Sequence, residues 1–171
     1  HLEAADTNPL DGNRHAESPK VRIRMFSPER FHAHNLDELA KLTELWTLRL
    51  ADRLERDPTV LGLAVGPALK NRTALADEEQ RALEVLRNLR LQWAEDGLSQ
   101  ARALADLGEI ERRLGEVLSD EVRALTRVDP TATGYGAVQG AYVVQRQHAA
   151  VVTEEEQAAW ALGNLAAAEQ A

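Results

Sequence analysis

The chain of 171 residues contains no cysteine, few aromatic residues and no long apolar run. Without cysteine it has no disulfide, thiolate zinc site, iron–sulfur cluster or cysteine nucleophile. No run of about 18 apolar residues is present, so we expect no transmembrane helix. Aromatic residues make up only 4% of the chain, which argues against a haem or bilin pocket. The sequence identifies no cofactor.

Common catalytic motifs are also missing. The chain has no Gly-x-Ser-x-Gly motif, and Gly134-Tyr135-Gly136 lacks the Gly-Lys-Ser or Gly-Lys-Thr of a phosphate loop. The formal net charge is −8, with 28 acidic residues against 20 basic ones. A chain with this net negative charge is repelled by the phosphates of a nucleic acid, which argues against binding to a nucleic-acid backbone.

The residues that are present suit one globular domain, because 44% are hydrophobic and 28% are charged. The chain begins at His1, which we interpret as either a mature N-terminus or the remainder of a tag. We favour a cytoplasmic location over a secreted or periplasmic one.

The most regular stretch runs from Ser99 to Val128 and predicts one central helix about 45 Å long. Its apolar residues recur every three or four positions, and Asp129-Pro130 ends the pattern. Gly108 and Gly115 add a stripe of small residues seven positions apart. Such residues allow another backbone to come close, either a helix of the same chain or the same helix of a second subunit.

Several shorter segments also have helical patterns. Helix signals begin at Ser27-Pro28, at Asn35, at Asp77 and at Thr153, and the segment 138–152 fits a helix better than a strand. Gly66-Pro67 predicts a break, which leaves a short apolar segment at 60–65. We therefore predict an all-α bundle of five to six helices, with one domain at 27–171 and a flexible N-terminal arm at 1–26.

The arm contains an alternating segment at 20–26. Val21, Ile23 and Met25 share one face and basic residues occupy the other, which is typical of a strand. Without an obvious second strand, the segment either lies along the bundle or pairs with a partner chain. The three apolar residues are therefore candidate interface positions.

The basic residues of the helices suggest a possible anion site. Arg49 and Arg53 precede the predicted break, Lys70 and Arg72 follow it, and convergent cations of this kind can hold a dicarboxylate. The stretch from Leu45 to Gly97 is loosely similar to the helical chorismate mutases. That resemblance places Arg53, Lys70 and Glu78 nearest to the family's ligand-binding positions, although Gly66-Pro67 interrupts what is one helix in that family.

The histidines and the tryptophans are two further groups with a predicted role, one in metal binding and the other in the core. His32 and His34 form a His-x-His pair that could bind a metal, but on a helix the two rings point apart. The three tryptophans fall on three separate predicted helices, a pattern typical of core residues.

From these features we expect a non-enzymatic, regulatory helical protein that acts through self-association and partner binding, with a homo-oligomer as the expected state. The alternative is a bundle that binds a small anion, or acts on one, through its clustered arginines.

Overall fold

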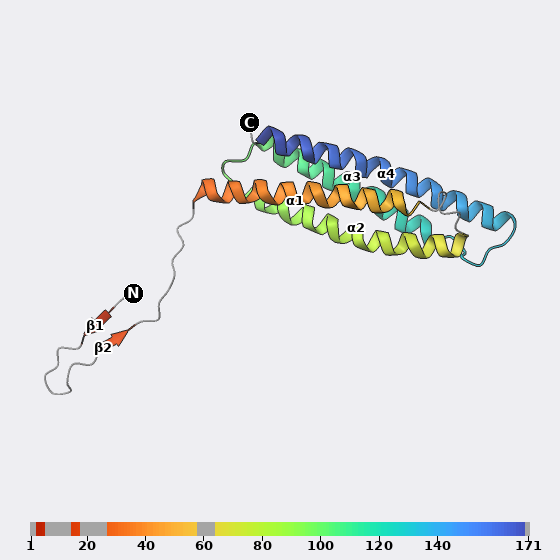
Figure 1. Cartoon of the computed structure of the whole chain (residues 1–171), viewed down its shortest axis with the longest axis horizontal. Helices are drawn as coiled ribbons and strands as arrows, with labels where there is room; N and C mark the ends of the chain where they lie inside the picture. Colours follow the sequence, from red (N-terminus) through yellow and green to blue (C-terminus); the bar gives the residue numbers. More distant parts are fainter. Residues whose placement is uncertain (1–2, 6–14, 18–26, 58–63, 170–171) are drawn as a thin grey trace.

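The protein forms a four-helix bundle in the computed structural model, which describes residues 3–5, 15–17, 27–57 and 64–169. The helices are α1 (Pro28–Glu55), α2 (Val65–Ala94), α3 (Ala101–Leu125) and α4 (Tyr135–Glu169). Consecutive helices run in opposite directions; α1 and α3 each pack against both α2 and α4 (Figure 1). The predicted all-α bundle is confirmed, but the described residues form four helices rather than five to six.

Helix α1 joins two segments that the sequence analysis separated. It begins as expected, because the Ser27 side chain accepts a hydrogen bond from the Arg30 backbone at 3.3 Å and Pro28 occupies the first turn. Asn35, however, lies inside the helix and does not begin a new one. Its side chain is buried and donates to Asp96 at 2.8 Å, so a tertiary contact replaces the expected cap.

Helix α2 begins earlier than the sequence suggested. Gly66 and Pro67 lie within its first turn rather than in a break. The amide nitrogens of a first helical turn have no partner within the helix, so proline removes no hydrogen bond there. Asp77, where the sequence predicts the start of a helix, is therefore an interior position of α2. Most of the apolar segment 60–65 lies outside the described residues, and only Ala64 and Val65 are placed.

The predicted long central helix is not the longest one. Helix α3 has 25 residues and is the shortest of the four described helices, whereas α4 has 35. Ser99 does not cap α3, because its hydroxyl bonds to the carbonyl groups of Trp93 and Asp96 in the preceding turn. Thr153 likewise bonds back to Ala149 within α4, so the two predicted C-terminal helices are one.

The described part of the N-terminal arm consists of two short strands. Strand β1 (Glu3–Ala5) pairs in antiparallel fashion with β2 (His15–Glu17), with Ala4 opposite Ala16. The alternating segment 20–26, including Val21, Ile23 and Met25, lies outside the described residues.

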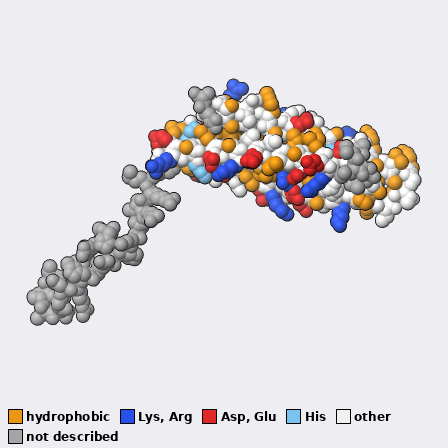
Figure 2. Space-filling view, in the orientation of Figure 1, with side chains coloured by type: hydrophobic (Ala, Val, Ile, Leu, Met, Phe, Trp, Pro, Cys, Tyr) orange, Lys and Arg blue, Asp and Glu red, His pale blue; other side chains and the backbone are white. Residues whose placement is uncertain are grey.

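The core of the bundle is built mainly from leucine. Trp46 on α1 and Trp93 on α2 are fully buried, which confirms the prediction for these two tryptophans. Trp160 on α4 is 74% exposed, so the same expectation was wrong for it. Charged and apolar side chains are interspersed over the face of the bundle drawn in Figure 2. Among the described helices, none has the length and apolar character that crossing a membrane requires.

Candidate functional site

Six titratable side chains lie inside the bundle, at positions where the helical spacing places core residues. They are fully or almost fully buried and come from all four helices. We call this set the buried charge layer; it consists of Arg53 on α1, Arg72 and Glu79 on α2, Glu121 on α3, and His148 and Glu155 on α4.

Arg53 is the centre of the buried charge layer. Its Nε donates to Glu79 at 2.8 Å, and its Nη2 donates to the second Glu79 oxygen. The two terminal nitrogens also donate to the two oxygens of Glu121, each at 2.9 Å. One oxygen of Glu155 lies 3.5 Å from Nε. A single guanidinium from α1 therefore contacts a carboxyl group from each of the other three helices.

A second group of polar side chains lies beside this centre, where α1 ends. Arg72 donates to the backbone oxygen of Arg56 at 2.7 Å, while its Nε and Nη1 atoms have no hydrogen-bond partner. His148 Nε2 lies 3.1 Å from Asp57 Oδ2. These contacts connect the C-terminal end of α1 to α2 and α4.

Burial shifts the pKa values of these groups in different directions. Burial would lower the pKa of Arg53, but hydrogen bonds to Glu121 and Glu79 outweigh it and raise that pKa. Burial and the nearby charge of Arg53 lower the pKa of Arg72 to about 10, so Arg72 stays charged at neutral pH. Burial raises the pKa of Glu79, which Arg53 opposes. The centre is thus a buried ion pair in which one guanidinium is shared by several carboxyl groups.

The four cations predicted as a ligand site do not converge on one cavity. Arg49 is partly buried and pairs with Glu78 and with Asp52 at 3.0 Å. Lys70 is exposed. Arg53 and Arg72 are buried, but Arg53 is surrounded by carboxyl groups of the same chain. The arrangement therefore does not favour binding of an anion at this set.

The two predicted metal-binding histidines are also separated. His32 Nδ1 lies 2.9 Å from Asp96 Oδ2, and its ring lies 6.4 Å from that of Trp93. His34 is exposed on another face of α1. Within the described ranges, no group of three or more His, Cys, Asp or Glu residues could hold a metal ion. His32 instead helps to attach the start of α1 to the α2–α3 turn.

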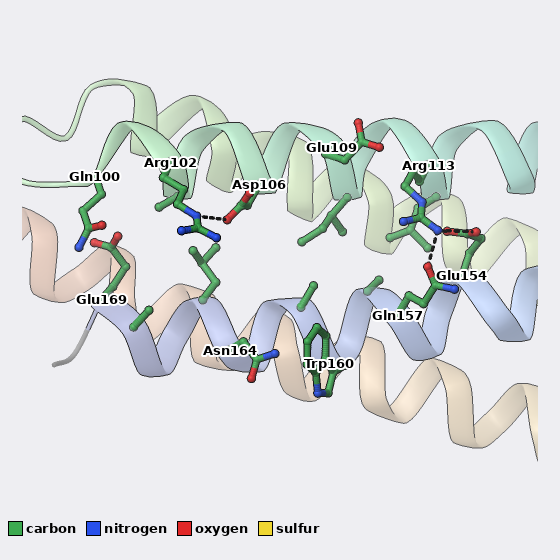
Figure 3. Close-up of a pocket in the computed structure, with 17 residues that line it drawn as sticks. Gln100, Arg102, Asp106, Glu109, Arg113, Glu154, Gln157, Trp160, Asn164 and Glu169 are labelled. Atoms are coloured by element: carbon green, nitrogen blue, oxygen red, sulfur yellow. Dashed lines mark hydrogen bonds and ion pairs between the residues drawn. The ribbon is translucent and has the colours of Figure 1, made fainter.

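A groove with a volume of about 530 Å³ lies between α3 and α4. Its floor is apolar and includes the buried side chains of Ile110 and Leu114 from α3 and of Leu165 from α4. Charged and amide side chains line its rim (Figure 3). Arg113 reaches across from α3 to Glu154 at 2.8 Å. Trp160 lies on the α4 side of the groove, where its large apolar surface remains exposed.

The predicted interface glycines lie near α2. A Cβ atom added at Gly115 would lie 3.6 Å from Leu83 Cδ2, and one added at Gly108 would lie 3.7 Å from Arg90 Cδ. Both glycines therefore serve the packing of α3 against α2 within the chain. This placement favours the intramolecular alternative, while self-association stays a prediction.

The sequence analysis missed the acidic half of the buried charge layer. At the end of α1 the apolar Leu54 is 47% exposed, whereas its neighbour Arg53 is buried. The signal that reveals these residues is the regular spacing of core positions along each helix. Extended through α2, α3 and α4, that spacing places charged residues where apolar ones are expected, at Glu79, Glu121 and Glu155.

Fold and site together define an antiparallel four-helix bundle whose core holds an arginine bonded to glutamates of neighbouring helices. Comparison with protein-family models, with curated proteins and with solved structures gave no match.

Proposed function

We propose that the protein is a non-enzymatic helical interaction protein that binds a basic amphipathic helix of a partner in the groove between α3 and α4. The observation that carries this proposal is Trp160, which is 74% exposed on the groove although the other two tryptophans are fully buried. Exposed tryptophan beside an apolar floor is the kind of residue that dominates binding energy at protein interfaces.

The shape of the groove supports a helix as its occupant. On one side the lining extends from Gln100, just before α3, to Leu114, and on α4 it extends from Glu154 to Glu169. At about 1.5 Å per residue these stretches are about 20 Å long, which matches three to four turns of a helix. A helix satisfies its own backbone hydrogen bonds when it enters an apolar groove, which an extended segment does not.

The charge of the groove supports a basic occupant. Its lining contains two arginines, Arg102 and Arg113, and four acidic residues. The acidic ones are Asp106, Glu109, Glu154 and Glu169. The lining is therefore net acidic, and the whole chain has a formal net charge of −8. A second copy of the chain would be repelled by this like charge, whereas a partner helix with lysine or arginine would be attracted.

The alternative function, binding of a small anion, has less support. Arg53 is neutralised inside the bundle, Arg49 is paired and Lys70 is exposed. A homodimer through the segment 20–26 or through α3 remains a separate prediction.

The proposal can be tested with two model peptides of 18 residues, one an amphipathic Leu–Lys helix and the other its Leu–Glu counterpart. Because Trp46 and Trp93 are buried, a change in tryptophan emission on binding reports mainly on Trp160. We expect the Leu–Lys peptide to bind and shift the emission to shorter wavelength, and the Leu–Glu peptide not to bind.

Two variants assign the binding to the groove. Trp160→Ala should weaken binding of the Leu–Lys peptide, measured by calorimetry, about tenfold or more. Tyr142→Ala is the matched control, because Tyr142 is an exposed aromatic residue of α4 outside the groove lining, and it should bind as the wild type does. Equal binding by both peptides or by Trp160→Ala would contradict the proposal. So would a concentration-dependent dimer that Trp160→Ala dissociates, because a second copy would then occupy the groove.

A further inference from the structure

The buried charge layer is not neutral when all of its carboxyl groups are ionised. It contains two arginines and three glutamates, and each of these five side chains is fully buried. Three ionised carboxylates against two guanidinium groups leave one negative charge inside the bundle. An uncompensated buried charge is strongly unfavourable, so the layer is neutral when it holds one additional proton.

The hydrogen bonds identify the carboxyl group that holds this proton. Glu79 and Glu121 each accept two hydrogen bonds from Arg53, which favours their ionised forms. Neither oxygen of Glu155 accepts a hydrogen bond from Arg53, and the nearer one lies 3.5 Å from Arg53 Nε. Glu155 instead lies beside the carboxyl group of Glu79, and two carboxyl groups can share a hydrogen bond only when one of them is protonated. Glu155 is therefore the carboxyl group with the least stabilisation as an anion.

The groups around Glu155 come from every element packed against it. Arg53 belongs to α1, Arg72 and Glu79 to α2, Glu121 to α3, and His148 lies two helical turns earlier on α4. Beyond His148, Asp57 follows the end of α1. Burial and the negative charge of Glu79 raise the pKa of Glu155 to about 8. Burial and the charge of Arg72 lower the pKa of His148 to about 4, so the histidine does not take this proton at neutral pH.

We propose that the buried charge layer is a proton-operated latch: Glu155 holds one proton that keeps the four helices closed, and loss of that proton loosens the bundle. The proton neutralises the third carboxyl group without breaking either bidentate pair of Arg53. Once the proton leaves, three carboxylates face two guanidinium groups in the core, and opening of the bundle exposes the unbalanced negative charge to water.

The direction of the pH dependence follows from the two shifted groups. In the unfolded chain Glu155 is ionised above its ordinary pKa of 4.5, whereas the folded chain keeps the proton up to about pH 8. Stability from this group therefore falls as the pH rises from 4.5 to 8. His148 acts in the opposite direction, because stability falls as the pH drops from 6.5 to 4. The two slopes cancel between about pH 4.5 and 6.5 and leave only the loss above that range.

The first experiment is urea unfolding of the full chain at pH 6.5 and 8. We expect the unfolding equilibrium constant of the wild type to rise about eightfold over this interval, because Glu155 contributes a rise of about 16-fold and His148 offsets about twofold of it. Glu155→Gln mimics the protonated carboxyl group in size and charge, so its unfolding constant should stay almost unchanged. Glu154→Gln is the matched control, because Glu154 lies on the groove rim and pairs with Arg113, and it should keep the slope of the wild type.

A second measurement decides the matter even if Glu155→Gln does not fold. The unfolding enthalpy of the wild type at pH 7.2, measured in buffers of different ionisation enthalpy, counts the protons released on unfolding. We expect a net release of about 0.7 proton per chain, because Glu155 releases about 0.9 and the unfolded His148 takes up about 0.2. A count near zero, a flat profile for the wild type, or a pH slope that persists in Glu155→Gln would overturn the latch.

Discussion

The two halves of the bundle use the same helical spacing with opposite chemistry. Around Trp46 and Trp93 the core positions are apolar, whereas near the end of α1 the corresponding positions carry Arg53 and its three glutamates. Apolar packing is stabilising but has no direction, so it tolerates small shifts of one helix along another. The planar guanidinium donates hydrogen bonds only to carboxyl groups in defined positions. The charged half is therefore suited to fixing the position of each helix along its neighbours.

At the end of the apolar half, a polar contact joins α1 to the turn between α2 and α3. Asp96, in the turn between α2 and α3, accepts hydrogen bonds from the Asn35 side chain and, at 3.0 Å, from the Leu98 backbone. Burial alone would raise the pKa of Asp96, but the bonds from Asn35 and His32 outweigh burial and lower that pKa. Here the carboxylate is fully compensated at the rim of the bundle, in contrast to the crowded carboxyl groups around Arg53.

The largest effect should come from removing the cation of the charged half. Arg53→Ala leaves three buried carboxyl groups without their shared partner, and we expect a loss of about 5 kcal/mol in the free energy of unfolding. Urea denaturation at pH 6.5 measures it. Arg112→Ala is the control, because the Arg112 side chain is 53% exposed and pairs with Glu109 and Glu116 at the surface, and it should cost only a small fraction of that loss. Similar losses for both variants would show that the buried guanidinium contributes no more to stability than an exposed one.

The apolar half should respond to the loss of volume rather than charge. Trp46→Ala or Trp93→Ala should lower the free energy of unfolding by about 3 to 5 kcal/mol, because each creates a cavity in the core. Trp160→Ala should change it by no more than about 0.5 kcal/mol, since its side chain is mostly exposed. A loss below about 1 kcal/mol for either core tryptophan would contradict its place in the structure.

The smallest effects should come from the contact between α3 and α2. Gly115→Leu should cost about 1 to 3 kcal/mol by overpacking against Leu83. Gly115→Ala fits at an ordinary contact distance and should stabilise the helix by up to about 1 kcal/mol.

The same two variants address self-association. Sedimentation of the wild type and both variants at tens of micromolar separates packing within the chain from a contact between copies. If the homodimer prediction is correct, Gly115→Leu should reduce association, whereas a monomeric wild type would exclude that dimer.

The amino-acid sequence by itself determined the helical class and much of the helical pattern. Apolar residues spaced by three or four positions identified the stripes that contain Trp46, Trp93 and Leu114, and Ser27-Pro28 correctly predicted the start of α1. These features depend on neighbours in the same helix, so they can be read without knowledge of the fold. The same local rules placed breaks at Asn35 and Gly66-Pro67, where the chain continues as helix.

Only the tertiary structure decided what those apparent breaks and charges do. Asn35 stays inside α1 because Asp96, 61 residues later, accepts its hydrogen bond. Arg53 is in the core because glutamates from three other helices surround it, and none of them is its neighbour in sequence. A buried charge is stable only where oppositely charged groups from distant segments surround it. In this chain those segments come together only in the folded bundle.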